Sequence, residues 1–69
     1  MSDADTARTN GWTVGTRLVG DEGYGPTVIE LTAIGRDQVL AVMISHNGKP
    51  QTECEGSWTF RCRDWQVVQ

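Results

Sequence analysis

Apolar side chains recur along this chain with a period close to two, and glycine or Asn-Gly interrupts them about every eight to twelve residues. Residues 12–19 alternate in this way, and residues 58–62 do so again. A period of two places successive side chains on opposite faces of a strand, whereas a helix needs apolar residues three and four apart. The pattern therefore predicts short β-strands joined by tight turns.

Turn-forming residues divide the chain into segments of strand length. The expected strands are residues 12–19, 27–34, 38–45, 51–55 and 58–62. Asn47-Gly48 is the strongest turn signal, because Asn and Gly tolerate the positive φ angles of a type I′ hairpin. Gly56-Ser57 is expected to turn the fourth strand into the fifth. Residues 66–69 are then expected to close the sheet, after a 3₁₀-type turn at residues 63–65.

The first ten residues differ in character from the rest. Residues 1–10 hold no large apolar side chain except the initiator Met1, so only residues 11–69 can build a core. A core of this size supports one domain, with a net stability of about 3–5 kcal/mol. Short antiparallel strands hide their edges most simply by closing into a barrel. We therefore expect an all-β fold, a small five-stranded SH3-like barrel at residues 11–69, behind a polar N-terminal tail that is disordered or loosely attached.

The charge balance narrows the choice of partner. The chain carries a net charge of −3 and has a pI near 4.8. Phosphate backbones attract the opposite sign, so a protein partner or self-association is favoured over nucleic acid. The first residues show neither a cationic start nor an apolar stretch, and the longest apolar run, residues 39–44, is too short to span a membrane. We expect a cytoplasmic protein with no membrane partner.

Metal and disulfide chemistry are both disfavoured. Cys54 and Cys62 are the two cysteines and His46 is the one histidine, which are too few ligands for a zinc site. If a turn at Gly56-Ser57 joined their strands, the two cysteine Cα atoms would lie beyond the roughly 7 Å that a disulfide tolerates. We therefore expect no cofactor, no metal and no bond between the cysteines.

Groups that could catalyse a reaction are not gathered in a recognisable pattern. His46 is expected at an exposed hairpin tip, where nothing holds it beside a nucleophile. The acidic pairs, Asp21 with Glu22 and Glu53 with Glu55, are expected on solvated surfaces. The chain is therefore expected to have no enzymatic activity and no small-molecule substrate.

Two polar surfaces are candidates for binding. The loop after the first strand combines the acids Asp21 and Glu22 with Tyr24, the one aromatic ring that the pattern does not assign to the core. Such a loop suits a basic segment of a partner protein. The alternative is a patch of basic residues that suits a phosphate or a carboxylate: Arg36, Arg61 and Arg63.

The third expected strand is apolar on both of its faces, which a simple barrel does not explain. Its outer face, formed by Leu40, Val42 and Ile44, is expected to be covered by barrel curvature, by the N-terminal tail or by a partner. Trp58 and Phe60 alternate with polar residues and are expected in the core.

Several short motifs match a known group of proteins: Trp12-Thr13-Val14-Gly15, Gly25-Pro26-Thr27-Val28, Ala33-Ile34-Gly35, Trp58-Thr59-Phe60-Arg61 and Arg63-Asp64-Trp65. Over about residues 11–68 the chain resembles small SH3-like barrel proteins of unknown function that are encoded by actinobacterial phages and prophages. The resemblance implies a phage-encoded accessory protein in the cytoplasm of a bacterial host. It transfers no functional residue, because that family carries no agreed activity.

A looser resemblance is to SH3 domains as a class, in which an acidic, aromatic loop and the last strand line a shallow peptide groove. Asp21, Glu22 and Tyr24 match the loop in character, and Trp65 matches the start of the last strand in place. The Ala-Leu-Tyr-Asp-Tyr run of those domains is absent, so recognition of proline-rich peptides is not implied. The expected function is a non-catalytic protein-interaction module. The alternative is a nucleic-acid-associated small barrel that uses the arginine patch, with steep salt dependence.

Overall fold

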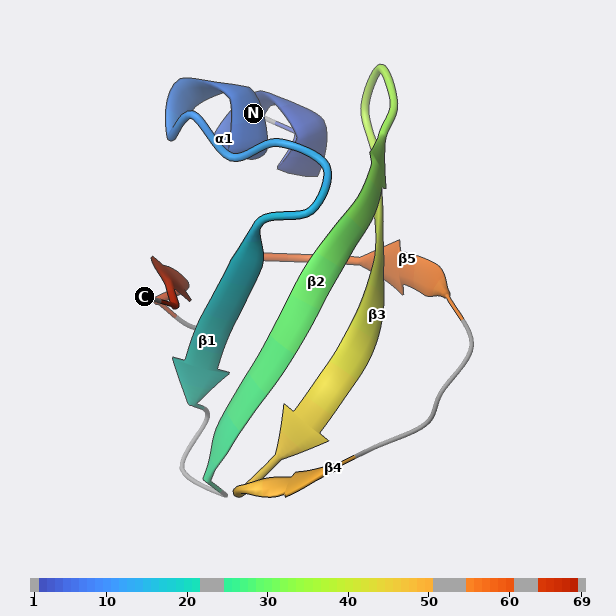
Figure 1. The fold of residues 1–69 in the computed structure, drawn as a ribbon. Helices are drawn as coiled ribbons and strands as arrows, with labels where there is room; N and C mark the ends of the chain where they lie inside the picture. Colours follow the sequence, from blue (N-terminus) through green and yellow to red (C-terminus); the bar gives the residue numbers. More distant parts are fainter. Residues whose placement is uncertain (1, 22–24, 51–54, 61–63, 69) are drawn as a thin grey trace.

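The computed structural model describes residues 2–21, 25–50, 55–60 and 64–68. Their helix and strands are α1 (Asp3–Thr9), β1 (Arg17–Asp21), β2 (Pro26–Ile34), β3 (Val39–His46), β4 (Lys49–Pro50), β5 (Gly56–Trp58) and β6 (Gln66–Val67). The strands form one antiparallel sheet in the order β4-β3-β2-β1-β6, and β5 pairs with the first half of β3 (Figure 1). In this part of the chain, no helix is long and apolar enough to cross a membrane.

The mostly-β class predicted from the sequence is confirmed. The last strand returns to the first, with Leu18 opposite Val67 and Val19 opposite Gln66, so that β6 extends the sheet beyond β1. The described sheet is open and has six strands, which differs from the closed five-stranded barrel that the sequence predicts. The difference arises because β4 and β5 pair with separate halves of β3.

The hairpin of β2 and β3 is the longest paired unit and follows the prediction closely. The next turn, from β3 into β4, also follows the prediction: Asn47 and Gly48 have φ angles of 53° and 80°, the positive values that a type I′ turn requires. Two register shifts interrupt the β2–β3 pairing, one between Val28 and Ile29 and one between Leu31 and Ala33. Such bulges bend a strand and increase its twist. This bending curves the sheet around the side chains on its inner face.

The core lies on one face of this curved sheet. Alternate residues of the three long strands point into it and are completely buried: Leu18, Ile29, Leu31 and Val39. Three aromatic side chains from outside these strands cover that face, together with two alanines of α1: Trp12, Phe60, Trp65, Ala4 and Ala7. Burial of apolar surface is the main stabilising contribution in a domain of this size.

Three predicted boundaries are wrong. The strand expected at residues 58–62 ends at Trp58, so Phe60 lies outside the sheet. The first strand begins at Arg17, because the chain turns at residues 13–16 and Gly15 adopts a φ of 92°, which is outside the strand region. Trp12 therefore leaves the sheet and folds over the core. Gly56 and Ser57 do not form a turn but pair with Ala41 and Leu40 as part of β5.

The register used to separate the cysteines depended on that Gly56-Ser57 turn. Because Gly56 and Ser57 belong to a strand, that reasoning no longer holds. Cys54 and Cys62 themselves lie outside the described residues. The absence of a bond between them stays a prediction.

The prediction of a disordered or loosely attached tail at residues 1–10 is wrong, since most of this segment is helix α1. A capping box opens the helix: Asp5 N donates to Ser2 Oγ at 3.1 Å, and Ser2 N donates to Asp5 Oδ2 at 3.3 Å. Ala4 and Ala7 lie on one side of the helix and are both 0% exposed. Their small side chains let the helix backbone come close to the core without any large apolar residue.

Backbone carbonyls of the turn between β2 and β3 also bind α1. Ala4 N donates to Asp37 O at 3.2 Å, and the Arg8 guanidinium donates to the carbonyls of Arg36 and Gly35. The helix therefore contacts both the β2–β3 turn and the core of the sheet (Figure 1). A helix of this length is not stable alone in water, so these tertiary contacts are what keep it folded.

Acidification is expected to loosen α1. Hydrogen bonds from the backbone and then the side chain of Ser2 hold the pKa of Asp5 below its ordinary value of 3.8. The ionised carboxylate therefore stabilises the folded state above that pH, and this contribution is lost as the pH falls through the lowered folded pKa. Protection factors of the α1 amides, which correct for the intrinsic pH dependence of exchange, should fall in wild type as the pH drops through the lowered pKa of Asp5. Asp5→Asn cannot titrate, so an equally steep acid loss of α1 in this variant would contradict the prediction.

Candidate functional site

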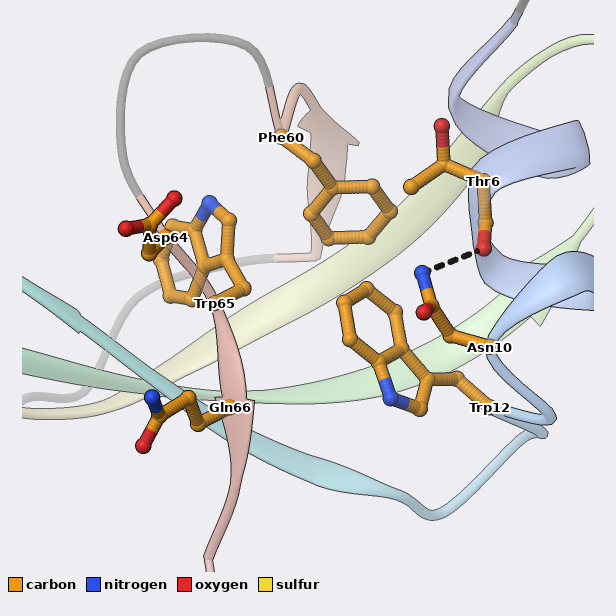
Figure 2. A pocket seen from close by; sticks show the side chains of 7 residues that line it. All are labelled: Thr6, Asn10, Trp12, Phe60, Asp64, Trp65 and Gln66. Atoms are coloured by element: carbon orange, nitrogen blue, oxygen red, sulfur yellow. Dashed lines mark hydrogen bonds between the residues drawn. The ribbon is translucent and has the colours of Figure 1, made fainter.

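An open pocket of about 370 Å³ lies where α1 meets the C-terminal segment. Its lining comes from α1 and its C-cap, from the segment that follows, and from the residues around β6: Thr6, Asn10, Trp12, Phe60, Asp64, Trp65 and Gln66 (Figure 2). Segments from both ends of the sequence therefore form this one surface. It is the candidate functional site, and we call it the aromatic pocket.

Three aromatic rings form the walls of the pocket. The ring centroids of Trp12 and Phe60 are 5.2 Å apart, those of Phe60 and Trp65 are 6.1 Å apart, and both pairs meet edge to face. Trp58 packs in the same way against Trp65, at 5.9 Å. All three wall residues are 8–9% exposed, so their rings are held in place by the core and present only a small surface to the pocket.

The backbone around each wall residue is fixed by specific contacts. Trp12 N donates to Ala7 O at 2.8 Å, which folds the chain back on the end of α1. Phe60 N donates to Asp3 Oδ1 at 3.1 Å, so the first turn of α1 positions the Phe60 ring. Trp65 directly precedes β6, whose pairing with β1 anchors it. These contacts hold the three wall residues in place.

The rim of the pocket is polar. Asn10 Nδ2 donates to Thr6 O at 2.8 Å, which orients the amide of Asn10 at the end of α1 (Figure 2). Asp64 and Gln66 are exposed on the opposite side. Among the seven lining residues, Asp64 is the only ionisable one. Among the residues that the structure describes, the pocket therefore combines aromatic walls with one carboxylate and neutral hydrogen-bonding groups.

The sequence-predicted recognition loop is only partly described. Asp21 is exposed at the end of β1, and its Oδ1 accepts a hydrogen bond from Gly25 N at 3.3 Å, a contact that closes the loop. Glu22 and Tyr24 lie outside the described residues, so their role stays a prediction. Trp65, which was assigned to the same surface, is buried and is a wall of the aromatic pocket.

The alternative arginine patch is described at one position. Arg36 is exposed in the turn between β2 and β3, where its carbonyl accepts a hydrogen bond from Arg8. Arg61 and Arg63 lie outside the described residues. Whether the three come together stays a prediction.

The expectation that nothing holds His46 is wrong. His46 is partly buried at the end of β3, and its Nδ1 lies 2.8 Å from Thr27 Oγ1 on the neighbouring strand. A hydroxyl beside an imidazole is the arrangement of an activated nucleophile. Thr27 is only 3% exposed, however, so a substrate cannot reach its oxygen, and the pair serves to satisfy a buried hydroxyl.

The outer side of β3 is less exposed than an open apolar face would be. Leu40, Val42 and Ile44 are each half-buried, whereas Val39 and Ala41 on the inner side are buried. An ion pair shares this outer face, with Arg17 Nε 3.0 Å from Glu30 Oε1. In the residues that the structure describes, no group of three or more His, Cys, Asp or Glu side chains could hold a metal ion.

Four residues of the pocket rim were missed from the sequence: Thr6, Asn10, Asp64 and Gln66. The first two were missed because residues 1–10 were expected to be a tail. Ser2 followed three residues later by Asp5, with acids in the first turn and Arg8 in the last, was the available signal for a helix. For Asp64 and Gln66 the sequence holds no comparable signal.

Comparison with known proteins gives one family. A family model described as "Domain of unknown function (DUF7241)" matches residues 1–69. No curated protein matches, and no solved structure matches.

Proposed function

The chain belongs to that family over its whole length, and we propose that it is a non-catalytic protein-interaction module that binds a segment of a partner protein at the aromatic pocket. The observation that carries this proposal is the convergence of Trp12, Phe60 and Trp65 on one open surface. Tryptophan and tyrosine are enriched among the residues that dominate the binding energy of protein interfaces, and rings held rigidly by a core lose little conformational freedom on binding.

The geometry of the pocket favours a polypeptide over a small molecule. The pocket is open to solvent on one side, and a volume of about 370 Å³ is close to the lower limit for small-molecule sites. A side chain of a partner can enter this space while the rest of its chain stays outside. The polar rim, with Asn10 and Gln66, can then bind the partner's backbone.

We propose further that the protein is a small SH3-like barrel and a phage-encoded accessory protein that acts in the cytoplasm of a bacterial host. The order of the strands supports the first point: β1, β2 and β3 pair in sequence, and β6 returns to β1. The proposed phage origin rests on the sequence resemblance in residues 11–68. A module that folds from so short a chain has little room for a catalytic cavity, which supports a binding role.

A displayed library of random peptides tests the proposed function. Peptides enriched on the wild-type protein are expected to lose at least about tenfold in affinity when Gln66→Trp fills the pocket, because the new indole competes for the same aromatic walls. Gln66 is exposed, so this change should leave the melting temperature close to that of wild type.

Gln38→Trp is the matched control, since Gln38 is also exposed and does not line the pocket. Peptides that bind Gln66→Trp at full strength would contradict the pocket as the site. If the same peptides are lost from a variant carrying Asp21→Ser, Glu22→Ser and Tyr24→Ser, the loop is the site instead. Failure to enrich any peptide, together with strongly salt-dependent binding of an oligonucleotide, would favour the arginine patch and nucleic acid.

A further inference from the structure

We infer that the group bound by the aromatic pocket is a positively charged side chain, an arginine or a lysine of the partner segment. This inference rests on the proposed function, because it takes the pocket as the binding site. It specifies the chemistry that the pocket recognises.

The aromatic walls favour a cation. An indole or phenyl ring carries partial negative charge on its faces, and a cation within about 6 Å of the ring centroid is attracted to it, most strongly by tryptophan. Two of the three walls are tryptophans, and Figure 2 shows Trp12 and Trp65 on two sides of the opening with Phe60 between them. The rings pack edge to face at centroid separations of 5.2 and 6.1 Å, so the small exposed parts of all three lie around the same opening.

The charges around the pocket also favour a cation. Asp64 on the rim is exposed and is the one ionisable side chain among the lining residues that the structure describes. Arg8, the basic residue of α1, is engaged elsewhere, by Asp5 at 3.7 Å and by the carbonyls of Gly35 and Arg36. The net charge of −3 adds a negative field over the whole molecule, which raises the rate at which cations arrive and disfavours anions.

The hydrogen-bonding groups of the rim distinguish a cation from an apolar side chain. Asn10 uses its Nδ2 to bond Thr6 O, which leaves the Oδ1 of the same amide as an acceptor toward the pocket. An apolar occupant would remove water from this oxygen and from the Asp64 carboxylate without replacing the lost hydrogen bonds, and that is costly. A guanidinium or ammonium group has hydrogen-bond donors to offer a rim oxygen while its stem packs on the rings.

A pair of small probes tests the inference: n-butylguanidinium, which mimics an arginine side chain, and n-butylurea, its neutral counterpart of similar shape. Binding is followed by the indole N–H resonances of Trp12 and Trp65 at constant ionic strength. We expect n-butylguanidinium to shift both resonances saturably, with an association constant at least about fivefold above that of n-butylurea. Asp64→Asn should lower the n-butylguanidinium constant roughly threefold and leave n-butylurea unchanged.

Glu55→Gln is the charge-matched control, because Glu55 is exposed and does not line the pocket. Equal affinity for both probes, or an Asp64→Asn variant that binds n-butylguanidinium like wild type, would overturn the inference. So would indole resonances that neither probe moves.

The peptide library separates this failure from failure of the proposed function. Peptides that are lost from Gln66→Trp but contain no Arg or Lys would overturn the cationic specificity and leave the pocket as the site. Peptides retained by that variant would overturn the pocket itself.

Discussion

Phe60→Ala is expected to leave most of the protein unfolded at 25 °C. The Phe60 side chain is 9% exposed and lies between the rings of Trp12 and Trp65, so its removal creates a cavity in the centre of the aromatic cluster. Truncating a buried phenylalanine to alanine costs about 3–5 kcal/mol. A domain of this size has a total stability of about 3–5 kcal/mol, so little or none remains. Urea denaturation followed by tryptophan fluorescence measures the loss.

Two control variants test whether the loss of stability comes from the missing Phe60 ring. Ser57→Ala, at an exposed position of the adjacent strand β5, should change the stability by no more than about 0.5 kcal/mol. Phe60→Leu keeps most of the volume and should fold, with a loss of about 1–2 kcal/mol. A cooperative transition for Phe60→Ala near the wild-type midpoint would show that the aromatic cluster does not support the core.

The central hairpin could be predicted from the sequence because its information is local. Residues 27–34 and 38–45 alternate or run apolar at strand length, with Gly35-Arg36-Asp37 between them, and Asn47-Gly48 ends the second segment with a turn into β4 that needs positive φ angles. The structure has β2 and β3 within one residue of those bounds. Local patterns of this kind depend on sterics and burial within a few residues, so one sequence is enough to read them.

The N-terminal helix could not be predicted by the same method, because its apolar face consists of Ala4 and Ala7. Alanine buries little surface, so a search for large apolar residues at helical spacing overlooks it. The hydrogen bonds that hold α1 in place join residues far apart in the sequence. Asp3 accepts from the backbone of Phe60, and Arg8 donates to the carbonyls of the β2–β3 turn. Contacts between residues far apart in the sequence leave no periodic pattern.

The aromatic pocket could not be predicted from the sequence either, because it too depends on contacts between distant residues. Phe60 and Trp58 were assigned to the core, and Phe60 is buried there while Trp58 is partly buried against it. Phe60 also forms a wall of an open pocket with Trp12 and Trp65. This second role depends on where α1 and β6 lie in the folded protein. Alternation of apolar and polar residues shows which side chains turn inward, but it does not show where the interior opens to solvent.

Ala7→Glu is expected to detach α1 and to dismantle the aromatic pocket with it. Ala7 is 0% exposed, and a carboxylate placed there has no partner and a high desolvation cost. The chain avoids that cost by releasing the helix, which cannot stay folded alone. Trp12 follows, because its backbone N–H bonds to Ala7 O. We expect a stability loss of about 2–4 kcal/mol, loss of exchange protection in α1, and a red shift of tryptophan emission.

Thr9→Glu is the control for the added charge, since Thr9 is exposed on the same helix. It should cost no more than about 1 kcal/mol, mainly because an acid near the C-terminal end of a helix opposes the helix dipole. A larger loss of stability in Ala7→Glu than in Thr9→Glu would therefore measure the packing of α1 on the core and not the effect of the added charge. If Ala7→Glu kept the wild-type melting temperature and emission, residues 1–10 would behave as the loose tail that the sequence predicts. The pocket would then lose the wall that Thr6 and Asn10 provide, and binding at Trp12, Phe60 and Trp65 would have to be explained without the helix.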